Sequence, residues 1–119
     1  MSSPVAWFEI TGSDGARLRE YYGSLFGWSY EVMDNYGVVA PAEQGIGGGV
    51  GQSQDGGNGT LTFYVEVDDV ASSLARAEEL GGRVVSPPMA VPGQDLTIAF
   101  FADPDGHMVG LSRGAVRGA

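Results

Sequence analysis

Residues 7–14 read WFEITGSD, and residues 64–69 read YVEVDD. In both stretches an alternating apolar strand leads directly to aspartate, a residue that often caps the N-terminus of a helix. An amphipathic segment follows each of them and ends at glycine, at Gly27 in the first case and at Gly81 in the second. Short apolar strands come next in both halves. The chain therefore repeats one strand–helix–strands unit, which predicts an α+β fold of two similar βαβββ modules.

The first module is expected over about residues 4–51. Its opening strand is predicted at Val5–Ile10, and its helix begins after a cap at Ser13 or Asp14. A helical stripe at Leu18, Tyr22, Leu25 and Phe26 is expected to pack on the sheet. The remaining strands are predicted at 28–33, 36–40 and 46–51, with a turn at Asp34-Asn35 between the first two.

The polar segment QSQDGGNG, residues 52–59, is expected to link the modules, so that the second covers about residues 60–113. Its elements are predicted as a strand at 60–67, a helix from about Val70 to Leu80, and strands at 96–102 and 107–112. A strand that begins at Val84-Val85 is expected to stop at Pro87-Pro88, because proline cannot donate a backbone hydrogen bond.

The strand alternation also predicts which side chains share a face. Trp7 and Glu9 fall on one face of the first opening strand, and Tyr64 and Glu66 take the same places in the second. The residues between them are apolar and are expected to face the helices. If the two modules associate about a pseudo-twofold axis, the four side chains would line one shared concave cavity.

Length and composition limit the classes of protein that fit. The 119 residues are 43% hydrophobic and 18% charged, which is typical of a single globular domain over 1–119. A net charge of −9 argues against nucleic-acid partners and anionic membrane surfaces, and it would attract a cationic small molecule. The sequence has no signal-peptide pattern or long apolar stretch, so we expect no membrane contact and a cytoplasmic location.

The chain resembles the vicinal oxygen chelate superfamily, which is also called the glyoxalase/bleomycin resistance/dioxygenase superfamily. The resemblance rests on residues 7–10 and 21–28 of the first module, and on residues 65–70 and 100–111 of the second, which include the turn Asp103-Pro104-Asp105-Gly106. It implies paired βαβββ modules that form a cupped, partly open barrel.

The resemblance also indicates where a metal would bind. Metal-using members usually place His, Gln or Glu at four inward positions, which correspond here to Trp7, about Tyr64, Gly110 and most nearly Gly48. Indole and glycine offer no side-chain ligand to a divalent cation, and a Tyr phenolate would be the sole exception. We therefore expect no metal and no cofactor.

These residues favour a binding protein over an enzyme. The expected function is to hold an aromatic or cationic compound, such as an antibiotic or a metabolite, and thereby sequester it. The candidate ligand-binding residues are Trp7, Glu9, Tyr36, Gly48, Tyr64, Glu66, Phe101, Met108 and Gly110. The expected partners are a small molecule and a second copy of the chain in a homodimer.

The two glutamates leave an alternative open. Glu9 and Glu66 could serve as general bases in a metal-dependent lyase, isomerase or dioxygenase of the glyoxalase type. Either glutamate could instead be half-exposed or paired with an arginine such as Arg83. His107, the single histidine, follows a tight turn, and we expect a structural or solvent-facing role for it.

Overall fold

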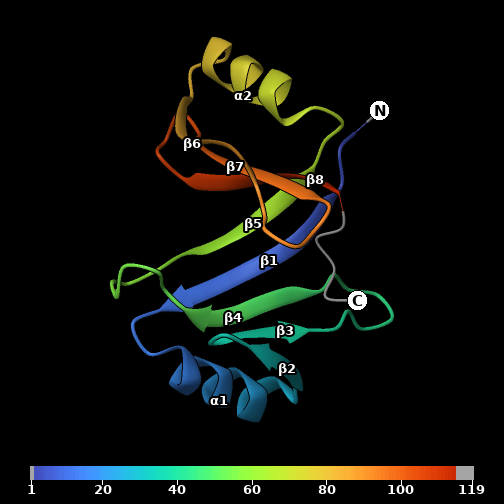
Figure 1. Cartoon of the computed structure of the whole chain (residues 1–119), viewed down its shortest axis with the longest axis vertical. Helices are drawn as coiled ribbons and strands as arrows, with labels where there is room; N and C mark the ends of the chain where they lie inside the picture. Colours follow the sequence, from blue (N-terminus) through green and yellow to red (C-terminus); the bar gives the residue numbers. More distant parts are fainter. Residues whose placement is uncertain (1, 115–119) are drawn as a thin grey trace. The chain divides into compact units, whose positions relative to one another are not determined.

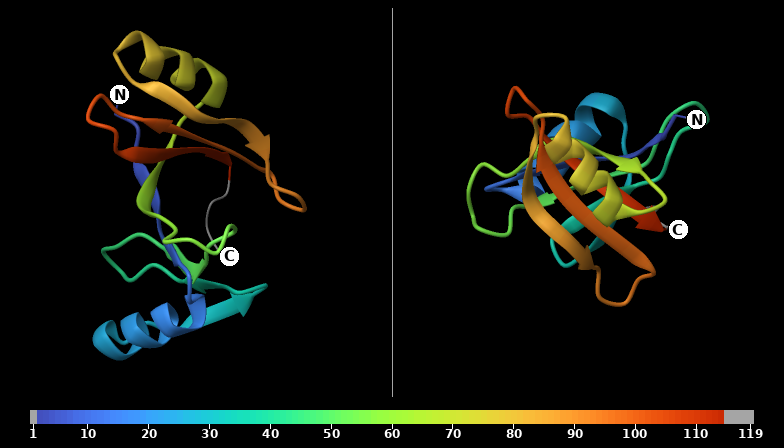
Figure 2. Two further views of the ribbon diagram at one scale, coloured as in Figure 1. Left: turned by 90° about the vertical axis from the view of Figure 1, so that its left-hand side faces the viewer. Right: turned by 90° about the horizontal axis from the view of Figure 1, so that it is seen from above.

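The computed structural model describes residues 2–114 and divides them into two compact units (Figure 1, Figure 2). The first unit comprises residues 7–62, and the second comprises residues 63–114 together with residues 2–6. We call them the N-terminal and the C-terminal unit and describe each by itself. Each contains one helix and strands of a mixed sheet, so the predicted α+β fold of two βαβββ modules is confirmed.

The elements of the N-terminal unit are β1 (Val5–Gly12), α1 (Gly15–Phe26), β2 (Tyr30–Met33), β3 (Tyr36–Val39) and β4 (Gly48–Gln52), of which β1 starts two residues before the unit does. The strand order is β2-β3-β4-β1. The pairs β2–β3 and β3–β4 are antiparallel, and β1 runs parallel to β4. This order puts β1 beside the glycine-rich β4. Because glycine has no side chain, side chains of neighbouring strands can lie close to the β4 backbone.

Local sequence signals explain where α1 and the β2–β3 hairpin begin and end. The side chain of Asp14 accepts a hydrogen bond from the backbone N–H of Arg17 at 3.1 Å, as an N-cap residue does. Gly27 ends the helix with φ 74°, a left-handed conformation that favours glycine. Asp34 and Asn35 have φ values of 50° and 67°, as a two-residue hairpin turn of type I′ requires.

The helical stripe of α1 is only partly buried. Leu18 and Tyr22 are half-buried, whereas Leu25 and Phe26 are each 57% exposed. The expectation that Leu25 and Phe26 pack on the sheet is therefore wrong. The Phe26 ring instead stacks on Tyr22 along the surface and contacts the ring of Trp28.

The elements of the C-terminal unit are β5 (Leu61–Glu66), α2 (Val70–Glu79), β6 (Arg83–Ala90), β7 (Leu96–Ala102) and β8 (Met108–Gly114), of which β5 starts two residues before residue 63. The strand order is β5-β8-β7-β6. β5 is parallel to β8, and the pairs β7–β8 and β6–β7 are antiparallel. Each unit therefore carries the same order of elements along the chain, as the sequence repeat predicts.

The expected stop at Pro87-Pro88 is wrong, because β6 continues to Ala90. β6 is at the outer edge of its unit's strand order and pairs on one side with β7. An edge strand tolerates proline, whose missing N–H can lie on the unpaired side. The cost is visible in the register, which shifts between Val84 and Ser86 and again between Ser86 and Met89.

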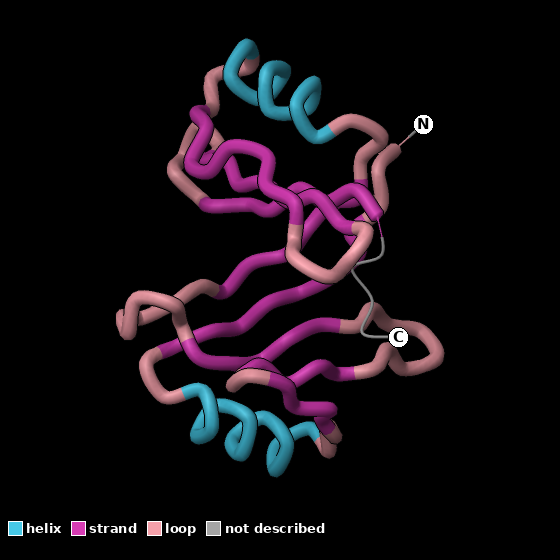
Figure 3. Tube along the Cα trace, in the orientation of Figure 1, coloured by secondary structure: helices cyan, strands magenta, loops and turns pink. Residues whose placement is uncertain are grey.

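The core of the C-terminal unit lies between α2 and the strands beside it (Figure 3). It is formed by the buried side chains of Val70, Leu74, Ala99 and Leu111. Val65 and Val67 of the opening strand and its continuation pack against this cluster, as their apolar face predicts. Neither helix is long and apolar enough to cross a membrane, among the residues that the structure describes.

Candidate functional site

A directed chain of hydrogen bonds joins three predicted site residues of the N-terminal unit. The indole N–H of Trp7 donates to the hydroxyl oxygen of Tyr36 at 3.1 Å, and the Tyr36 hydroxyl donates to Glu9 Oε1 at 3.1 Å. Burial, and then the nearby charge of Glu9, raise the pKa of the Tyr36 phenol well above its ordinary value. The phenol therefore keeps its proton and remains the donor to Glu9 at neutral pH.

The second carboxylate oxygen of Glu9 is also held. The hydroxyl of Thr60 donates to Glu9 Oε2 at 3.3 Å, and the hydroxyl oxygen of Thr11 is 3.2 Å from that of Thr60. Because the Thr60 hydroxyl proton points to Glu9, Thr11 must donate to Thr60. Glu9 thus accepts hydrogen bonds on both oxygens. Sequence reasoning missed Thr60, since residue 60 was assigned only to the start of a strand.

Three consecutive glycines differ in the face that they present. Gly49 pairs with Glu9 across β1 and β4, and a Cβ atom on Gly49 would overlap the hydroxyl of Tyr36. A Cβ atom on Gly48 would overlap the ring of Phe8, whereas one on Gly47 would be 3.3 Å from the Trp7 ring. The expectation that Gly48 shares the face of Trp7 and Glu9 is therefore wrong.

The reason is the period of two in a strand, which moves every side chain to the other face when the register slips by one residue. Gly47 and Gly49 lie on the face of Trp7 and Glu9, and Gly48 lies on the face that packs Phe8 towards Trp28. Three consecutive glycines show no alternation of side chains, so the register of β4 could not be predicted from the sequence.

The C-terminal unit carries a matching arrangement around Tyr64. Tyr64 pairs with Gly110 across β5 and β8, and a Cβ atom on Gly110 would be 2.6 Å from the Tyr64 ring. The ring of Phe100 lies 5.4 Å from that of Tyr64, centre to centre. Phe101, another candidate ligand-binding residue, instead packs against the core beside α2 and does not share the face of Tyr64 and Phe100. Met108 is two residues before Gly110 on β8 and therefore shares its face.

Glu66 is held within the same unit by other partners. Its Oε1 accepts a hydrogen bond from the Ser112 hydroxyl at 3.2 Å, and its Oε2 accepts one from the Gly114 backbone N–H at 3.1 Å. Ser112 is fully buried, and no ion pair joins Arg83 to Glu66 within residues 2–114. Both glutamates thus lie on the predicted faces, with hydroxyl and backbone donors as the hydrogen-bond partners identified for them.

The two large aromatic residues at the metal positions of the family are buried. Trp7 and Tyr64 are each 5% exposed. A ligand that stacks on either ring must first displace what covers it. The expectation that Trp7 and Tyr64 line one shared cavity stays a prediction.

The donor set does not fit the divalent metal that the family implies. Trp7 offers an indole N–H, which is a donor, and Gly47 and Gly110 offer no side chain. In residues 2–114, no three His, Cys, Asp or Glu side chains form a group that could hold a metal ion. We therefore derive no chemical step through a metal at these positions.

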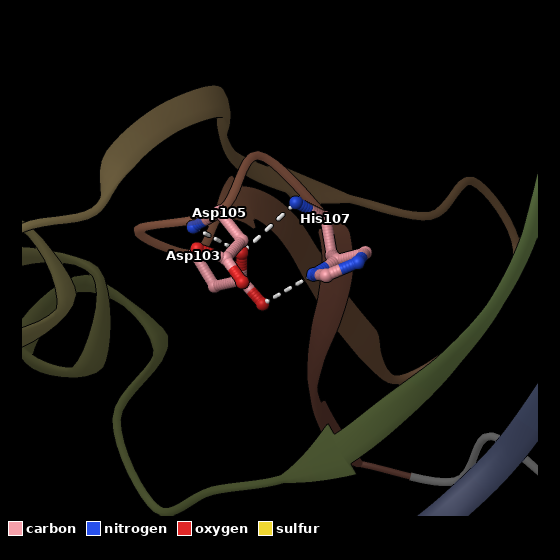
Figure 4. A network of polar contacts seen from close by, with 3 residues as sticks. All are labelled: Asp103, Asp105 and His107. Atoms are coloured by element: carbon pink, nitrogen blue, oxygen red, sulfur yellow. Dashed lines mark hydrogen bonds and ion pairs between the residues drawn. The ribbon is translucent and has the colours of Figure 1, made fainter.

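The single histidine belongs to the turn between β7 and β8 (Figure 4). Asp103 Oδ1 accepts hydrogen bonds from the backbone N–H groups of Asp105 and His107, both at 2.9 Å, and Asp103 Oδ2 is 3.0 Å from His107 Nδ1. The hydrogen bond from the His107 backbone, and then those from the His107 ring and the Asp105 backbone, lower the pKa of the Asp103 carboxyl. The His107 side chain is 73% exposed, and its contacts are those of a residue that closes a turn.

Comparison with known proteins gives the family. The glyoxalase-like domain family matches residues 7–112, nearly the whole described chain. The chain belongs to this family, and so to the vicinal oxygen chelate superfamily that its motifs resemble. Structures of methylmalonyl-CoA epimerase from Streptomyces coelicolor share its fold, one of them with a TM-score of 0.64 at 15% identity over 98% of this chain and 100% of the other.

Curated relatives are also similar in sequence. The chain is 32% identical to the anthracycline biosynthesis protein DnrV of Streptomyces peucetius over 96% of this chain, and 29% identical to the putative glyoxylase CFP32 of Mycobacterium bovis over 88%. The matches cover 48% and 43% of those proteins, so the chain spans about half the length of these relatives.

Proposed function

We propose that this protein binds a small organic molecule that carries a positively charged or hydrogen-bond-donating group, and that Glu9 recognises that group. The observation that supports this proposal is the directed chain from Trp7 through Tyr36 to Glu9. Its donors fix the Glu9 carboxylate in place as an acceptor before any ligand arrives. Preorganisation of this kind lowers the entropy that binding must overcome.

The chemistry of the ligand follows from the charge of the site. Glu9 is partly exposed, and the chain has a net charge of −9, so the surrounding potential favours a cation. One relative is named an anthracycline biosynthesis protein. We therefore propose a polycyclic aromatic compound with an amino group as the ligand class, and sequestration of such an antibiotic or metabolite as the role.

A matched pair of ligands tests the proposal. Isothermal titration would compare an anthracycline that has a free amino sugar with the same compound acetylated on that amine. We expect the free amine to bind more tightly and Glu9→Gln to remove the preference. A hydrogen bond between charged groups contributes about 1.5–3 kcal/mol, which corresponds to roughly 10-fold to 100-fold in Kd.

Glu31→Gln is the matched control, because Glu31 is an exposed glutamate on β2 of the same unit. It removes the same charge without touching the Trp7–Tyr36–Glu9 chain, and we expect little change in Kd. Equal binding of the two compounds by the unchanged protein, or the same loss in both variants, would contradict the role of Glu9.

An enzymatic function is the second candidate, and the name putative glyoxylase carried by one relative supports it. Glu9 would then accept a proton from a carbon next to a carbonyl group, and Tyr36 would position it. Metal analysis of protein purified without chelators separates the candidates. Stoichiometric zinc, nickel, manganese or iron would favour the enzyme and contradict metal-free binding.

A homodimer is part of the proposal. In the N-terminal unit, β2 is last in the strand order, and its Val32 and Met33 are 51% and 63% exposed. An edge strand with exposed apolar side chains is a surface that a second copy can cover. Light scattering at micromolar concentration would give twice the mass of 12.4 kDa if it does, and a monomer mass at all concentrations would contradict it.

A further inference from the structure

A cavity of the N-terminal unit lies beside the Glu9 cluster, with Thr11 and Thr60 in its wall. It has a volume of about 720 Å³ and lies against the first turns of α1, where β1 ends and residues 58–61 pass. Trp7, Glu9 and Tyr36 do not line it. Its size falls within the usual range of small-molecule sites.

The apolar part of the cavity comes from α1 and from the strands opposite it. It is formed by Ile10, Leu18, Tyr21, Tyr22 and Leu61. Leu61 is 80% exposed and Tyr21 is 60% exposed, although both are large side chains. Apolar surface of this kind around a hollow is typical of a binding site rather than of ordinary protein surface.

Several polar groups in or next to the cavity already have partners. The backbone N–H of Gly15 donates to Gln52 Oε1 at 2.9 Å, and that of Arg17 donates to Asp14 Oδ1 at 3.1 Å. The backbone N–H of Thr60 donates to the hydroxyl of Thr11 at 2.9 Å. The first two of these bonds occupy two of the backbone donors in the first turn of α1.

The guanidinium of Arg17 differs from these groups. It has no hydrogen bond or ion pair with any of residues 2–114. Arg19, by contrast, donates to the carbonyl oxygen of Asn35 at 3.0 Å, and Arg76 is paired with Glu79 at 3.1 Å. Arg17 is therefore the cationic group that this cavity offers to a ligand.

We propose that this cavity binds an amphipathic organic anion, an aromatic carboxylate or sulfonate. The aromatic body would lie against Tyr21, Leu18 and Leu61, and the acid group would receive two parallel hydrogen bonds from Arg17. Asp14 also lines the cavity and repels a second negative charge, so the ligand carries a single acid group. This site shares Thr11 and Thr60 with the hydrogen bonds that hold Glu9, but its charged group is Arg17 rather than Glu9.

Binding of anilinonaphthalene sulfonate, followed by its fluorescence and by titration calorimetry, tests the proposal. We expect saturable binding of one probe per chain, with Kd raised roughly fivefold or more by Arg17→Gln and restored in part by Arg17→Lys. Asp14→Asn keeps a good N-cap residue and removes the repelling charge, so it should lower Kd. Arg76→Gln is the control and should leave Kd unchanged.

Two results would overturn the proposal. One is a Kd that is the same in Arg17→Gln and Arg76→Gln, since binding would then depend on general charge or on another surface. The other is loss of probe binding as the protein concentration rises together with dimer formation, since a second copy would then cover the cavity. Leu61→Ser tests the apolar part of the cavity without a core substitution, since Leu61 is 80% exposed, and it should raise Kd.

Discussion

A single glycine determines whether Tyr36 can reach Glu9. A methyl group at Gly49 would occupy the place of the Tyr36 hydroxyl. We expect Gly49→Ala to displace the ring, break its bonds to Trp7 and Glu9, and lower the free energy of unfolding by about 1–3 kcal/mol through overpacking. Urea unfolding measures the loss, and ligand titration measures its effect on the site.

The control for this substitution is Gly45→Ala. A Cβ atom on Gly45 would meet nothing within 4 Å, and Gly45 is not among the glycines with a positive φ. Its stability should match that of the unchanged protein. If Gly49→Ala behaved like Gly45→Ala in both measurements, Tyr36 could not be held where the structure places it.

The Tyr36 phenol also makes stability depend on pH in the alkaline range. Burial and the charge of Glu9 raise its pKa above the ordinary value of 10.0, whereas in the unfolded chain the phenol ionises near that value. The stability that depends on the neutral phenol is therefore fully present below pH 10.0 and is lost as pH rises above it.

Tyr36→Phe should show a smaller fall in the free energy of unfolding above pH 10.0 than the unchanged protein. The comparison of the two proteins removes the contribution of other tyrosines, among them Tyr30, whose pKa burial also raises. Parallel alkaline profiles would mean that Tyr36 ionises as freely in the folded chain as in the unfolded one.

At the same scale, the sequence predicts some site residues better than others. Alternation along one strand suffices to place Trp7 with Glu9, since both belong to β1. It cannot place Gly48 or Phe101, because their faces depend on how β4 and β7 pair with neighbouring strands. Register is a tertiary property, and a run of glycines or a pair of phenylalanines carries no pattern that reveals it.

At the scale of elements, the ends of the helices are the best predicted features. Asp14 and Asp69 cap α1 and α2 through their own side chains, as their positions before amphipathic segments indicate. Hydrogen bonds from the Ser72 backbone and side chain lower the pKa of Asp69. Such local bonds depend on neighbours in sequence, so a single chain is enough to predict them.

The strand β6 shows where local signals mislead. Pro87 and Pro88 predict an end to the strand, yet the pairing with β7 resumes at Met89 and Ala90. The outcome depends on whether the strand is central or at the edge, and only the order β5-β8-β7-β6 decides that. Side-chain exposure on α1 is a similar case, because the stripe in the sequence cannot show that Leu25 stays 57% exposed.

At the scale of the whole molecule, the two modules share their order of elements but differ in the groups that surround the matching glutamates. Both opening strands carry a glutamate at the same place, but Glu9 is held by the hydroxyls of Tyr36 and Thr60, and Glu66 by Ser112 and a backbone N–H. The phenol that holds Glu9 belongs to Tyr36, on β3 of the first module. The two halves therefore offer a ligand different groups, although one plan generates them.

The charge of the whole chain leads to a last prediction, about rates. With a net charge of −9, the protein attracts a cationic ligand over a distance that salt sets: the screening length falls from about 30 Å at 0.01 M ionic strength to about 8 Å at 0.15 M. The association rate of the free-amine anthracycline should fall severalfold over this range, and that of its acetylated form should hardly change. Stopped-flow fluorescence measures both.

Because Glu9→Gln removes only one of these charges, it should weaken binding through faster dissociation and leave the salt dependence of association nearly intact. If salt slowed the neutral compound as much as the charged one, the field of the protein would have no part in bringing the ligand to Glu9.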